Sequence, residues 1–411
     1  MTWTTLAFIA LAWFAAAAVL LAVAFRSEIV RAWREPVLGE PVLIFESDDW
    51  GYGPLEQAQR LGEISALLAR HRDATGHPAV MTLGVVLAGP DGARIGAGSC
   101  TRYHRLTLAD ARYDRLREAM REGERSGVFA LQLHGMEHYW PPVLMRAAAS
   151  HAGVREWITS QGPPRTEDLP APLQSRWIDA ASLPSHPLPE GDVEQGVEEE
   201  VAAFRAVFGR TPEVAVPPTF VWSPEVERAW ARAGLTCLVS PGRRYHGRDA
   251  GGRPVSDGVP IANGQRAEDM VCVVRDDYFE PALGHRAERA LAQLEAKTRL
   301  GRPCLLETHR MNFLGDPALA ARSLAELDRV LAAARARWPG LRFLPTAELA
   351  GHLAGRTWPV DTRLAPRLNC LVARLAAIAR LRKLAWASGL AVPAGLLWLA
   401  TRAAHAAPRA K

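Results

Sequence analysis

Two adjacent aspartates follow a short apolar segment near the start of the central part of the chain. The segment 42–45, Val-Leu-Ile-Phe, runs into Glu46-Ser47-Asp48-Asp49-Trp50-Gly51, as a strand that ends in polar groups does. Neighbouring carboxylates raise each other's pKa unless a cation compensates for their charge. Asp48 and Asp49 therefore indicate a bound cation, although an Asp-Asp pair before glycine also occurs in turns and helix caps.

Two histidines stand four positions apart at the end of a second apolar segment. Leu131-Gln132-Leu133 leads into His134-Gly135-Met136-Glu137-His138. This spacing can bring both imidazoles to one metal ion, on a turn of helix or in a tight loop. With Asp49 as the third ligand, the set leaves one position open for water, as a catalytic zinc site requires. The sequence thus predicts one divalent metal ion, with zinc favoured, bound by Asp49, His134 and His138.

A third apolar segment, Cys304-Leu305-Leu306, ends in Glu307-Thr308-His309. A single histidine after a strand is usually structural. Three separate strands that end in Asp-Asp, His-x-x-x-His and His change this interpretation, because active sites of α/β barrels gather at the C-terminal ends of the strands. We therefore expect His309 to lie near the predicted metal ligands.

The elements that position these residues alternate between short apolar segments and helical patterns over about residues 40–353, which predicts βα units around a parallel sheet or barrel. Strands are expected over 41–45, 128–133, 213–216, 236–239, 304–307 and 341–344, and helices over 197–208, 224–233, 286–299 and 317–337. A proline-rich insertion, 139–192, interrupts this rhythm. Regular structure is not expected over much of it, and it is either a lid or a surface excursion.

These motifs resemble those of the NodB-type polysaccharide deacetylases, carbohydrate esterase family 4, over about residues 41–353. The resemblance implies a distorted (β/α) barrel of the glycoside hydrolase/deacetylase type. It makes Asp48 the catalytic base, Asp49 a metal ligand with the two histidines of the H-x-x-x-H motif, and His309 the terminal catalytic histidine. The implied reaction is hydrolysis of an N-acyl group, with N-acetyl favoured, from a sugar or polysaccharide. Oxyanion or substrate contacts are expected from Thr219, Trp50, Phe220 and Arg310.

The sequence departs from the pattern of the family at its R-x-P-Y motif. The stretch 209–220 and Ala233-Gly234-Leu235 resemble the surroundings of that motif, but Val216 stands where arginine is usual and Thr219 where tyrosine or phenylalanine is usual. Arg310 or Arg275 are candidates to replace the missing arginine as the partner of the base. The Asp-x-x-Asp-Trp motif of the family has only Asp276-Asp277-Tyr278 as a weak counterpart.

Two other functional classes fit parts of the sequence. The pattern His134-x-x-Glu137-His138 also satisfies the H-x-x-E-H motif of inverzincin metalloproteases, with Glu137 as base and Glu213 as a third ligand. That motif needs a continuous helix, whereas Gly135 and Pro141-Pro142 bracket this one. The missing motif arginine favours, instead, a non-catalytic carbohydrate-binding or scaffold protein with a deacetylase-like fold.

Apolar segments at both ends of the chain predict membrane attachment. Residues 1–25 contain no charged side chain and are long enough to span a bilayer, and no basic residue precedes them as in a signal peptide. A basic segment, 354–383, precedes a second apolar stretch, 384–401, which either spans the bilayer or lies in its interface.

The charge around the apolar ends decides between partners and between membrane sides. The net charge of +5 reflects basic flanks more than a nucleic-acid-binding patch, so the expected partners are the membrane and a carbohydrate or lipid-linked sugar. The positive-inside rule favours a cytoplasm-facing domain if both segments span. The basic residues on the domain side are then Arg26, Arg31, Arg34, Arg367, Arg374, Arg380, Arg382 and Lys383, against Arg402, Arg409 and Lys411 on the other side.

Overall fold

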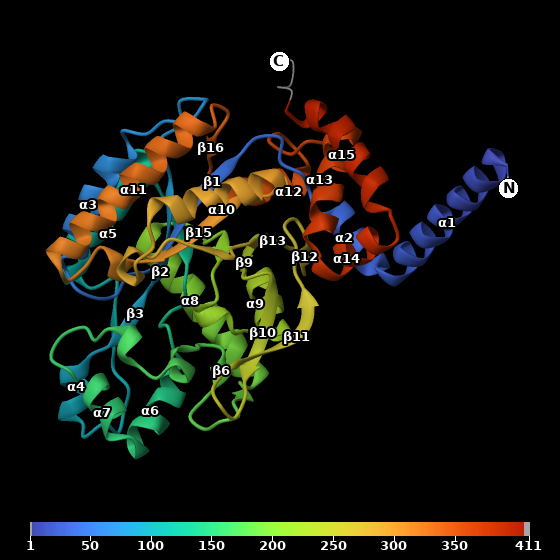
Figure 1. Ribbon diagram of the computed structural model, residues 1–411. Helices are drawn as coiled ribbons and strands as arrows, with labels where there is room; N and C mark the ends of the chain where they lie inside the picture. The colour runs from blue at the N-terminus through green and yellow to red at the C-terminus, as the bar shows by residue number, and fades with distance from the viewer. Residues whose placement is uncertain (1, 407–411) are drawn as a thin grey trace. The chain divides into compact units, whose positions relative to one another are not determined.

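A ten-stranded sheet forms the centre of the computed structural model, which describes residues 2–406 (Figure 1). Its strands pair in the order β12-β13-β9-β8-β5-β2-β1-β15-β14, and β16 pairs with β1 outside this path. The pairs from β13 through β9, β8, β5, β2, β1 and β15 to β14 are parallel, and only the β12 pair at one end is antiparallel among the pairs with a described register. The predicted distorted α/β barrel is therefore confirmed as a curled, mainly parallel sheet.

The strands of this sheet are short except for β1, the first along the chain, which has ten residues. They are β1 (Val42–Gly51), β2 (Met81–Val86), β5 (Phe129–Leu133), β8 (Val214–Ala215), β9 (Cys237–Ser240), β12 (Arg266–Ala267), β13 (Met270–Val274), β14 (Asp277–Tyr278), β15 (Cys304–His309) and β16 (Arg342–Phe343). Every residue of β1 and β2 is buried, as the continuous apolar runs of a parallel sheet require. Sequence reasoning found six of these ten strands and missed β2, β12, β13 and β14; of these, β2 and β13 have apolar segments that it did not separate from their surroundings.

Helices between the strands cover the sheet from outside (Figure 1). They are α3 (Gln57–Leu68), α5 (Asp114–Arg125), α8 (Glu190–Phe208), α9 (Pro224–Arg232), α10 (Ala287–Arg299) and α11 (Pro317–Arg337). Each of these helices buries apolar residues on one side, for example Leu61, Ile64 and Leu68 in α3. All four predicted helices are present, and the observed bounds of α11 coincide with the prediction.

The proline-rich insertion carries more regular structure than its composition suggested. It contains α6 (Pro141–Ser150), α7 (Ala152–Ile158), the 3₁₀ turns η2 (Thr166–Asp168) and η3 (Ala171–Gln174), and the paired strands β6 (Ile178–Asp179) and β7 (His186–Pro187). The expectation of irregular structure was wrong because Pro141 and Pro142 occupy the first positions of α6. Proline is tolerated there, since the first helical N–H groups have no partner within the helix.

The chain divides into two compact units. The larger unit comprises Leu43–Gln293 and Cys304–Gly351. The terminal unit comprises the described parts of Met1–Val42, Leu294–Pro303 and His352–Lys411. This partition differs from the predicted 40–353 domain mainly because residues 294–303 cluster with the chain ends.

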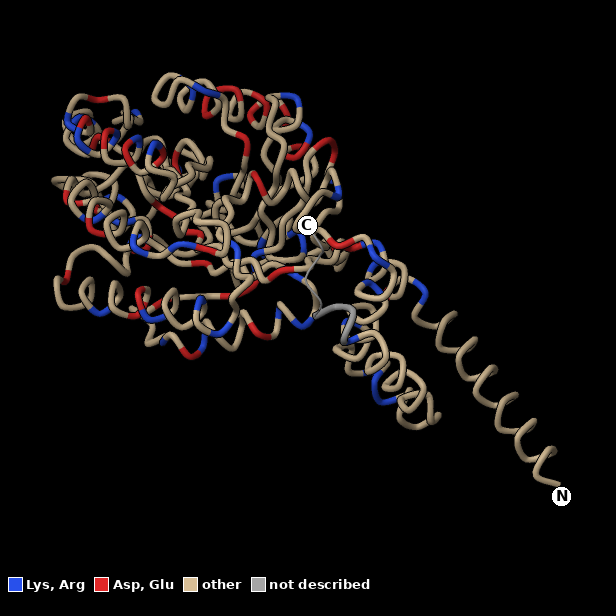
Figure 2. The backbone as a smooth tube through the Cα atoms, turned by 90° about the horizontal axis from the view of Figure 1, so that it is seen from above, with Lys and Arg blue, Asp and Glu red and all other residues tan. Residues whose placement is uncertain are grey.

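The terminal unit is helical and exposes apolar residues. It contains α1 (Trp3–Ala24), α2 (Arg26–Arg34), α13 (Leu364–Ala377), α14 (Ala379–Ala387) and α15 (Ala391–Ala406). By length and composition α1 is able to cross a membrane, and Figure 2 shows it as a run without charged residues. The second apolar segment is not one straight helix, because α14 and the stretch Ala391–Arg402 meet at a bend of 113°.

Candidate metal centre and active site

The end of β1 places two consecutive carboxylates in one cavity. Successive side chains of a strand normally point to opposite faces, so Asp48 and Asp49 should not share a site. The pairing of β1 with β2 shifts register between Ser47 and Trp50, and Asp49 has a φ of 72°. Such a bulge re-aims a side chain. As a result both aspartates line the same cavity.

Three side chains converge there in the manner of a metal site. One ligand atom each from Asp49, His134 and His138 lies within 4.8 Å of the others. The Oδ1 atom of Asp49 is 3.5 Å from the Nε2 atom of each histidine. Two ligands held about 2.1 Å from one tetrahedral ion would be about 3.4 Å apart, so these separations fit a shared ion. The Asp49 Oδ1 atom is also buried without a hydrogen-bond partner among the described residues, which such an ion would satisfy.

Backbone carbonyls orient both imidazoles. The Nδ1 atom of His134 lies 2.8 Å from the carbonyl oxygen of Val216, and that of His138 lies 2.8 Å from the carbonyl oxygen of Gln174. An Nδ1–H that donates to a carbonyl leaves the Nε2 lone pair for a metal, a common arrangement at such sites. Burial lowers the pKa of His138 to about 4, so this ring is neutral at neutral pH. The positive φ of Gly135, 97°, permits the tight loop between the two histidines.

Arg275 holds the second aspartate. Its guanidinium donates to both carboxylate oxygens of Asp48, at 3.2 and 2.6 Å, and it also contacts Glu46 and Glu307 at 3.3 and 3.2 Å. Burial alone would raise the pKa of Asp48, but Arg275 and then His134 outweigh burial and keep that pKa below its usual value. Asp48 is therefore an ionised proton acceptor. Of the two arginines named as substitutes for the one missing at Val216, Arg275 takes the place, directly after β13.

His309 faces Asp48 across the β1–β15 pair. The two residues are register partners, which places their side chains on the same face. The Nδ1 atom of His309 lies 2.7 Å from Glu280, whose other oxygen accepts from Asn312. Burial would lower the pKa of His309, but the hydrogen bond to Glu280 and the charge of Asp49 raise it to about 10. His309 therefore carries a proton at neutral pH and is able to donate it.

The cavity around these groups has a volume of about 310 Å³. Besides the five residues already described, it is lined by Arg275, Glu307, Met311, Pro217, Thr219, Phe220 and three residues of the insertion, Thr166, Glu167 and Gln174. Thr219 and Phe220 have positive φ values of 55° and 54°, and the hydroxyl of Thr219 lies 2.6 Å from that of Ser175. Residues of the insertion thus form part of the cavity wall, which favours the lid interpretation over a surface excursion.

Two predicted substrate contacts lie outside this cavity. Trp50 is fully buried, its indole N–H donates to the Ser47 hydroxyl, and its ring packs against Phe313. Arg310 is buried and donates to the carbonyl oxygen of Tyr52. The bulge turns Trp50 into the core and Arg310 binds backbone, so neither side chain lines this cavity, and their contact with substrate stays a prediction.

The metalloprotease alternative is also excluded by the geometry. Residues 134–135 have no regular structure and 136–139 form bends, so the continuous helix that the H-x-x-E-H motif requires is not present here. Glu137 is fully buried away from the cavity, where it pairs with Arg105 and Arg176. It is therefore unable to act as a base beside His134 and His138.

Sequence reasoning missed several residues that the site uses. Glu280 and Glu307 have no motif of their own, and only their spatial relation to His309 and Arg275 shows their roles. Gly84 on β2 is the third, because a Cβ atom at this position would lie 2.4 Å from the Oδ1 atom of Asp48. A glycine inside a strand is a signal of close approach that the sequence did carry.

Comparisons with known proteins find similarity only at the level of the fold. Neither a protein-family model nor a curated protein sequence matches the chain. A candidate polysaccharide deacetylase from Mycobacterium smegmatis is 15% identical, with 80% of this chain and 97% of that chain covered and a TM-score of 0.40. A family 4 carbohydrate esterase from Streptomyces lividans is 13% identical, with coverages of 76% and 96% and a TM-score of 0.34. The peptidoglycan deacetylase PdaC from Bacillus subtilis is 10% identical, with coverages of 77% and 93% and a TM-score of 0.35. These likenesses concern the fold alone, and the chemistry has to be argued from the residues of the site.

Proposed function

We propose that the larger unit, Leu43–Gln293 with Cys304–Gly351, is a catalytic unit: a metal-dependent hydrolase that removes an N-acyl group, with N-acetyl favoured, from a sugar or polysaccharide. The observation that carries this proposal is the shared cavity: the Asp49, His134 and His138 ligand set, the arginine-held carboxylate of Asp48 and the protonated His309 all line it. Amide hydrolysis needs a base for water and an acid for the departing amine. Asp48 supplies the base from β1 and His309 supplies the acid from the neighbouring strand β15, on the same face of the sheet.

The roles of the chain's own residues follow from their protonation states. When bound, a divalent metal ion, with zinc favoured, supplies Lewis-acid polarisation of the acyl carbonyl and a hydrolytic water at neutral pH. Asp48, kept ionised by Arg275, accepts a proton from water. His309 donates its proton to the nitrogen as the carbon–nitrogen bond breaks, and Glu280 holds the ring in place. The backbone N–H of Thr219 is the proposed donor to the developing oxyanion.

The walls of the cavity support a carbohydrate substrate. Thr166, Glu167 and Gln174 offer hydroxyl, carboxylate and amide groups to sugar hydroxyls, and Phe220 offers a ring against which a sugar can pack. We further propose that the substrate is a membrane-proximal or lipid-linked sugar and that the catalytic unit faces the cytoplasm. The charge-free α1 and the basic residues that follow it support this placement.

The first test uses the purified full-length protein in detergent. Elemental analysis should find about one zinc-like ion per chain, and released acetate should be measured over a panel of N-acetylated glycans. His134→Ala and His138→Ala should lose the metal. Full metal content in both variants would contradict the ligand assignment.

The second test separates catalysis from binding. Asp48→Asn and His309→Ala should keep the metal but lose on the order of 10²–10⁴-fold in turnover, the usual scale of acid–base catalysis. A wild-type protein that binds glycans but releases no acid, with neither variant changing this, would instead favour the non-catalytic carbohydrate-binding protein.

A further inference from the structure

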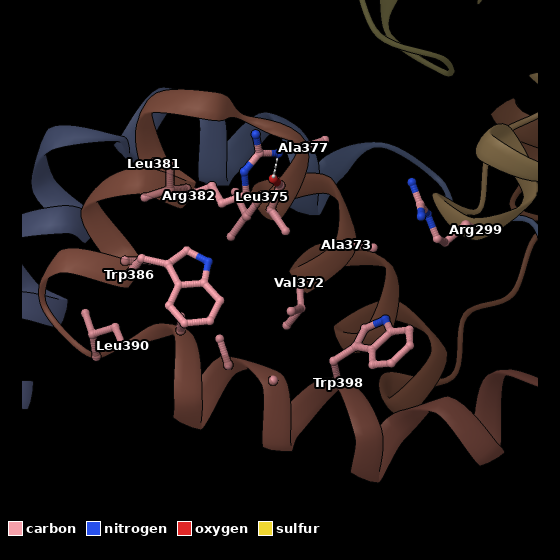
Figure 3. A pocket seen from close by; sticks show the side chains of 15 residues that line it. Arg299, Val372, Ala373, Leu375, Ala377, Leu381, Arg382, Trp386, Leu390 and Trp398 are labelled. Carbon is pink, nitrogen blue, oxygen red and sulfur yellow. Dashed lines mark hydrogen bonds between the residues drawn. The ribbon is translucent and has the colours of Figure 1, made fainter.

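A large apolar cavity lies within the terminal unit, and its lining differs from the polar lining of the cavity around Asp48 and Asp49. Its volume is about 600 Å³, which falls in the range of about 300–1,000 Å³ that ligand sites occupy. Its walls come from the end of α10 and from α13, α14 and α15, with Trp386 and Trp398 facing the space between these helices (Figure 3). Such walls offer contact to a hydrocarbon chain, not to a sugar.

The only charged groups among the described residues that line this cavity are two arginines, Arg299 and Arg382. Both are exposed, and Arg382 donates to the carbonyl oxygen of Ala376 at 3.1 Å, which fixes one face of its guanidinium. The lining contains no carboxylate among the described residues that would neutralise them. An apolar space bordered by two cations is complementary to a ligand with a hydrocarbon tail and an anionic head.

The helices around the cavity have the features of a segment that lies in a membrane interface. Val392 and Leu396 are each 63% exposed and do not line the cavity, so α15 also presents large apolar side chains outward. At about 1.5 Å per residue, the 16 residues of α15 measure about 24 Å, short of the roughly 30 Å hydrocarbon core. The bend and this length favour shallow insertion, the interfacial one of the two predicted alternatives for residues 384–401.

We propose that this cavity binds one acyl chain of an anionic membrane phospholipid, whose phosphate is held by Arg299 and Arg382. The lipid would complete the apolar interior of the terminal unit and seat α14 and α15 in one leaflet. This inference is independent of the proposed deacetylase activity, since it concerns only residues of the terminal unit. A polyprenyl phosphate and a second copy of this chain are the competing occupants.

Gly395 permits a clean test of occupancy. It lines the cavity, its φ is not positive, and a Cβ atom added there meets no atom within 4 Å. Gly395→Trp should therefore place a bulky side chain in the cavity and obstruct it without a backbone clash, and Gly395→Ala is the matched control that adds only a methyl group. Both variants should keep the wild-type melting temperature or exceed it, because glycine is unfavourable inside a helix.

The experiment is native mass spectrometry of the full-length protein in detergent, titrated with phosphatidylglycerol or with phosphatidylcholine of the same acyl chains. We expect one retained phosphatidylglycerol per chain, bound about tenfold more tightly than phosphatidylcholine. Gly395→Trp should abolish this adduct and Gly395→Ala should keep it. The double variant Arg299→Glu/Arg382→Glu should remove the preference for the anionic lipid, whereas Arg335→Glu, an exposed charge reversal on α11, should not.

Four results would overturn the proposal. They are an unchanged adduct in Gly395→Trp, equal binding of both phospholipids, displacement of phosphatidylglycerol by an equimolar polyprenyl phosphate, and a dimer that replaces the lipid adduct. Metal content and acid release from soluble glycans are measured on the same samples. If the catalytic proposal fails there while the lipid adduct behaves as expected, the lipid site stands by itself.

Discussion

Gly84→Ala should disable the catalytic base while leaving the metal ligands in place. The added Cβ atom would lie 2.4 Å from the Oδ1 atom of Asp48 and 3.2 Å from its Cγ atom. Real Cβ atoms do not approach closer than about 3.0 Å to such neighbours, so the carboxylate or β2 must move by at least about 0.6 Å and more comfortably by about 1 Å. The carboxylate has little freedom to do so, because Arg275 holds both of its oxygens.

The expected cost follows from this displacement. A misplacement of about 1 Å in a catalytic group costs about 10²-fold in rate, so the turnover of Gly84→Ala should fall by about that factor. The backbone of Gly84 does not have a positive φ, so alanine adds no torsional strain. Asp49, His134 and His138 are not among the atoms nearest to the added Cβ, and the metal content should stay near one ion per chain.

The assay is acid release at saturating glycan, with metal content and melting temperature measured on the same preparation. Gly62→Ala is the matched control, because an added Cβ atom there, on α3, meets nothing within 4 Å. It should keep full turnover and gain about 0.5–1 kcal/mol of stability. Wild-type turnover in Gly84→Ala would refute the placement of Asp48 as the base, and loss of metal in this variant would refute the separation of base from ligands.

The remaining predictions concern charge, metal and topology. Arg275→Met removes the cation shared by three buried carboxylates and should lower the free energy of unfolding by about 3–5 kcal/mol in chemical denaturation. An unchanged denaturation midpoint would show that these carboxylates do not depend on Arg275 for their stability. Glu280→Gln should lower the pKa of His309 from about 10, so the alkaline limb of the pH–rate profile should move to lower pH, and an unmoved limb would argue against His309 as the acid. Chelation should lower the melting temperature and added zinc should restore it; free zinc at 100 times its dissociation constant should stabilise the folded protein by about 2.7 kcal/mol. An unchanged melting temperature would contradict metal binding by the ligand set. A reporter that is active only outside the cytoplasm, fused after Arg34, should stay silent, and strong signal would reverse the predicted topology.

Sequence patterns predicted the site better than they predicted its surroundings. Asp49, His134 and His138 meet in one place because parallel strands expose their C-terminal ends at one edge, and that rule needs only strand ends and residue types. The bulge at Asp49 was not predictable in the same way, since it depends on the register of β1 against β2. The same bulge turns the indole of Trp50 into the core, so Trp50 does not line the cavity.

Residues that act through space rather than within a motif were the hardest to find. Glu280 is 29 positions from His309 along the chain, yet it holds the imidazole at 2.7 Å. Arg275 replaces an arginine that the motif around Val216 lacks, because the end of β13 faces the same interior as the ends of β1 and β15. A guanidinium can reach the base from any strand end that faces this interior. A missing motif arginine is therefore weak evidence that a site of this kind is inactive.

The charge balance of the catalytic cavity gives a reason, apart from motifs, to expect a cation. Six carboxylate side chains line the cavity or contact one of its cations: Glu46, Asp48, Asp49, Glu167, Glu280 and Glu307. The positively charged groups that pair with these carboxylates in the described site are Arg275 and a protonated His309, and burial raises the pKa of Glu307. Buried carboxylates without counter-charge are costly. A divalent ion at Asp49 offsets part of this excess, so the same residues that explain the chemistry also explain why the folded protein should hold a metal.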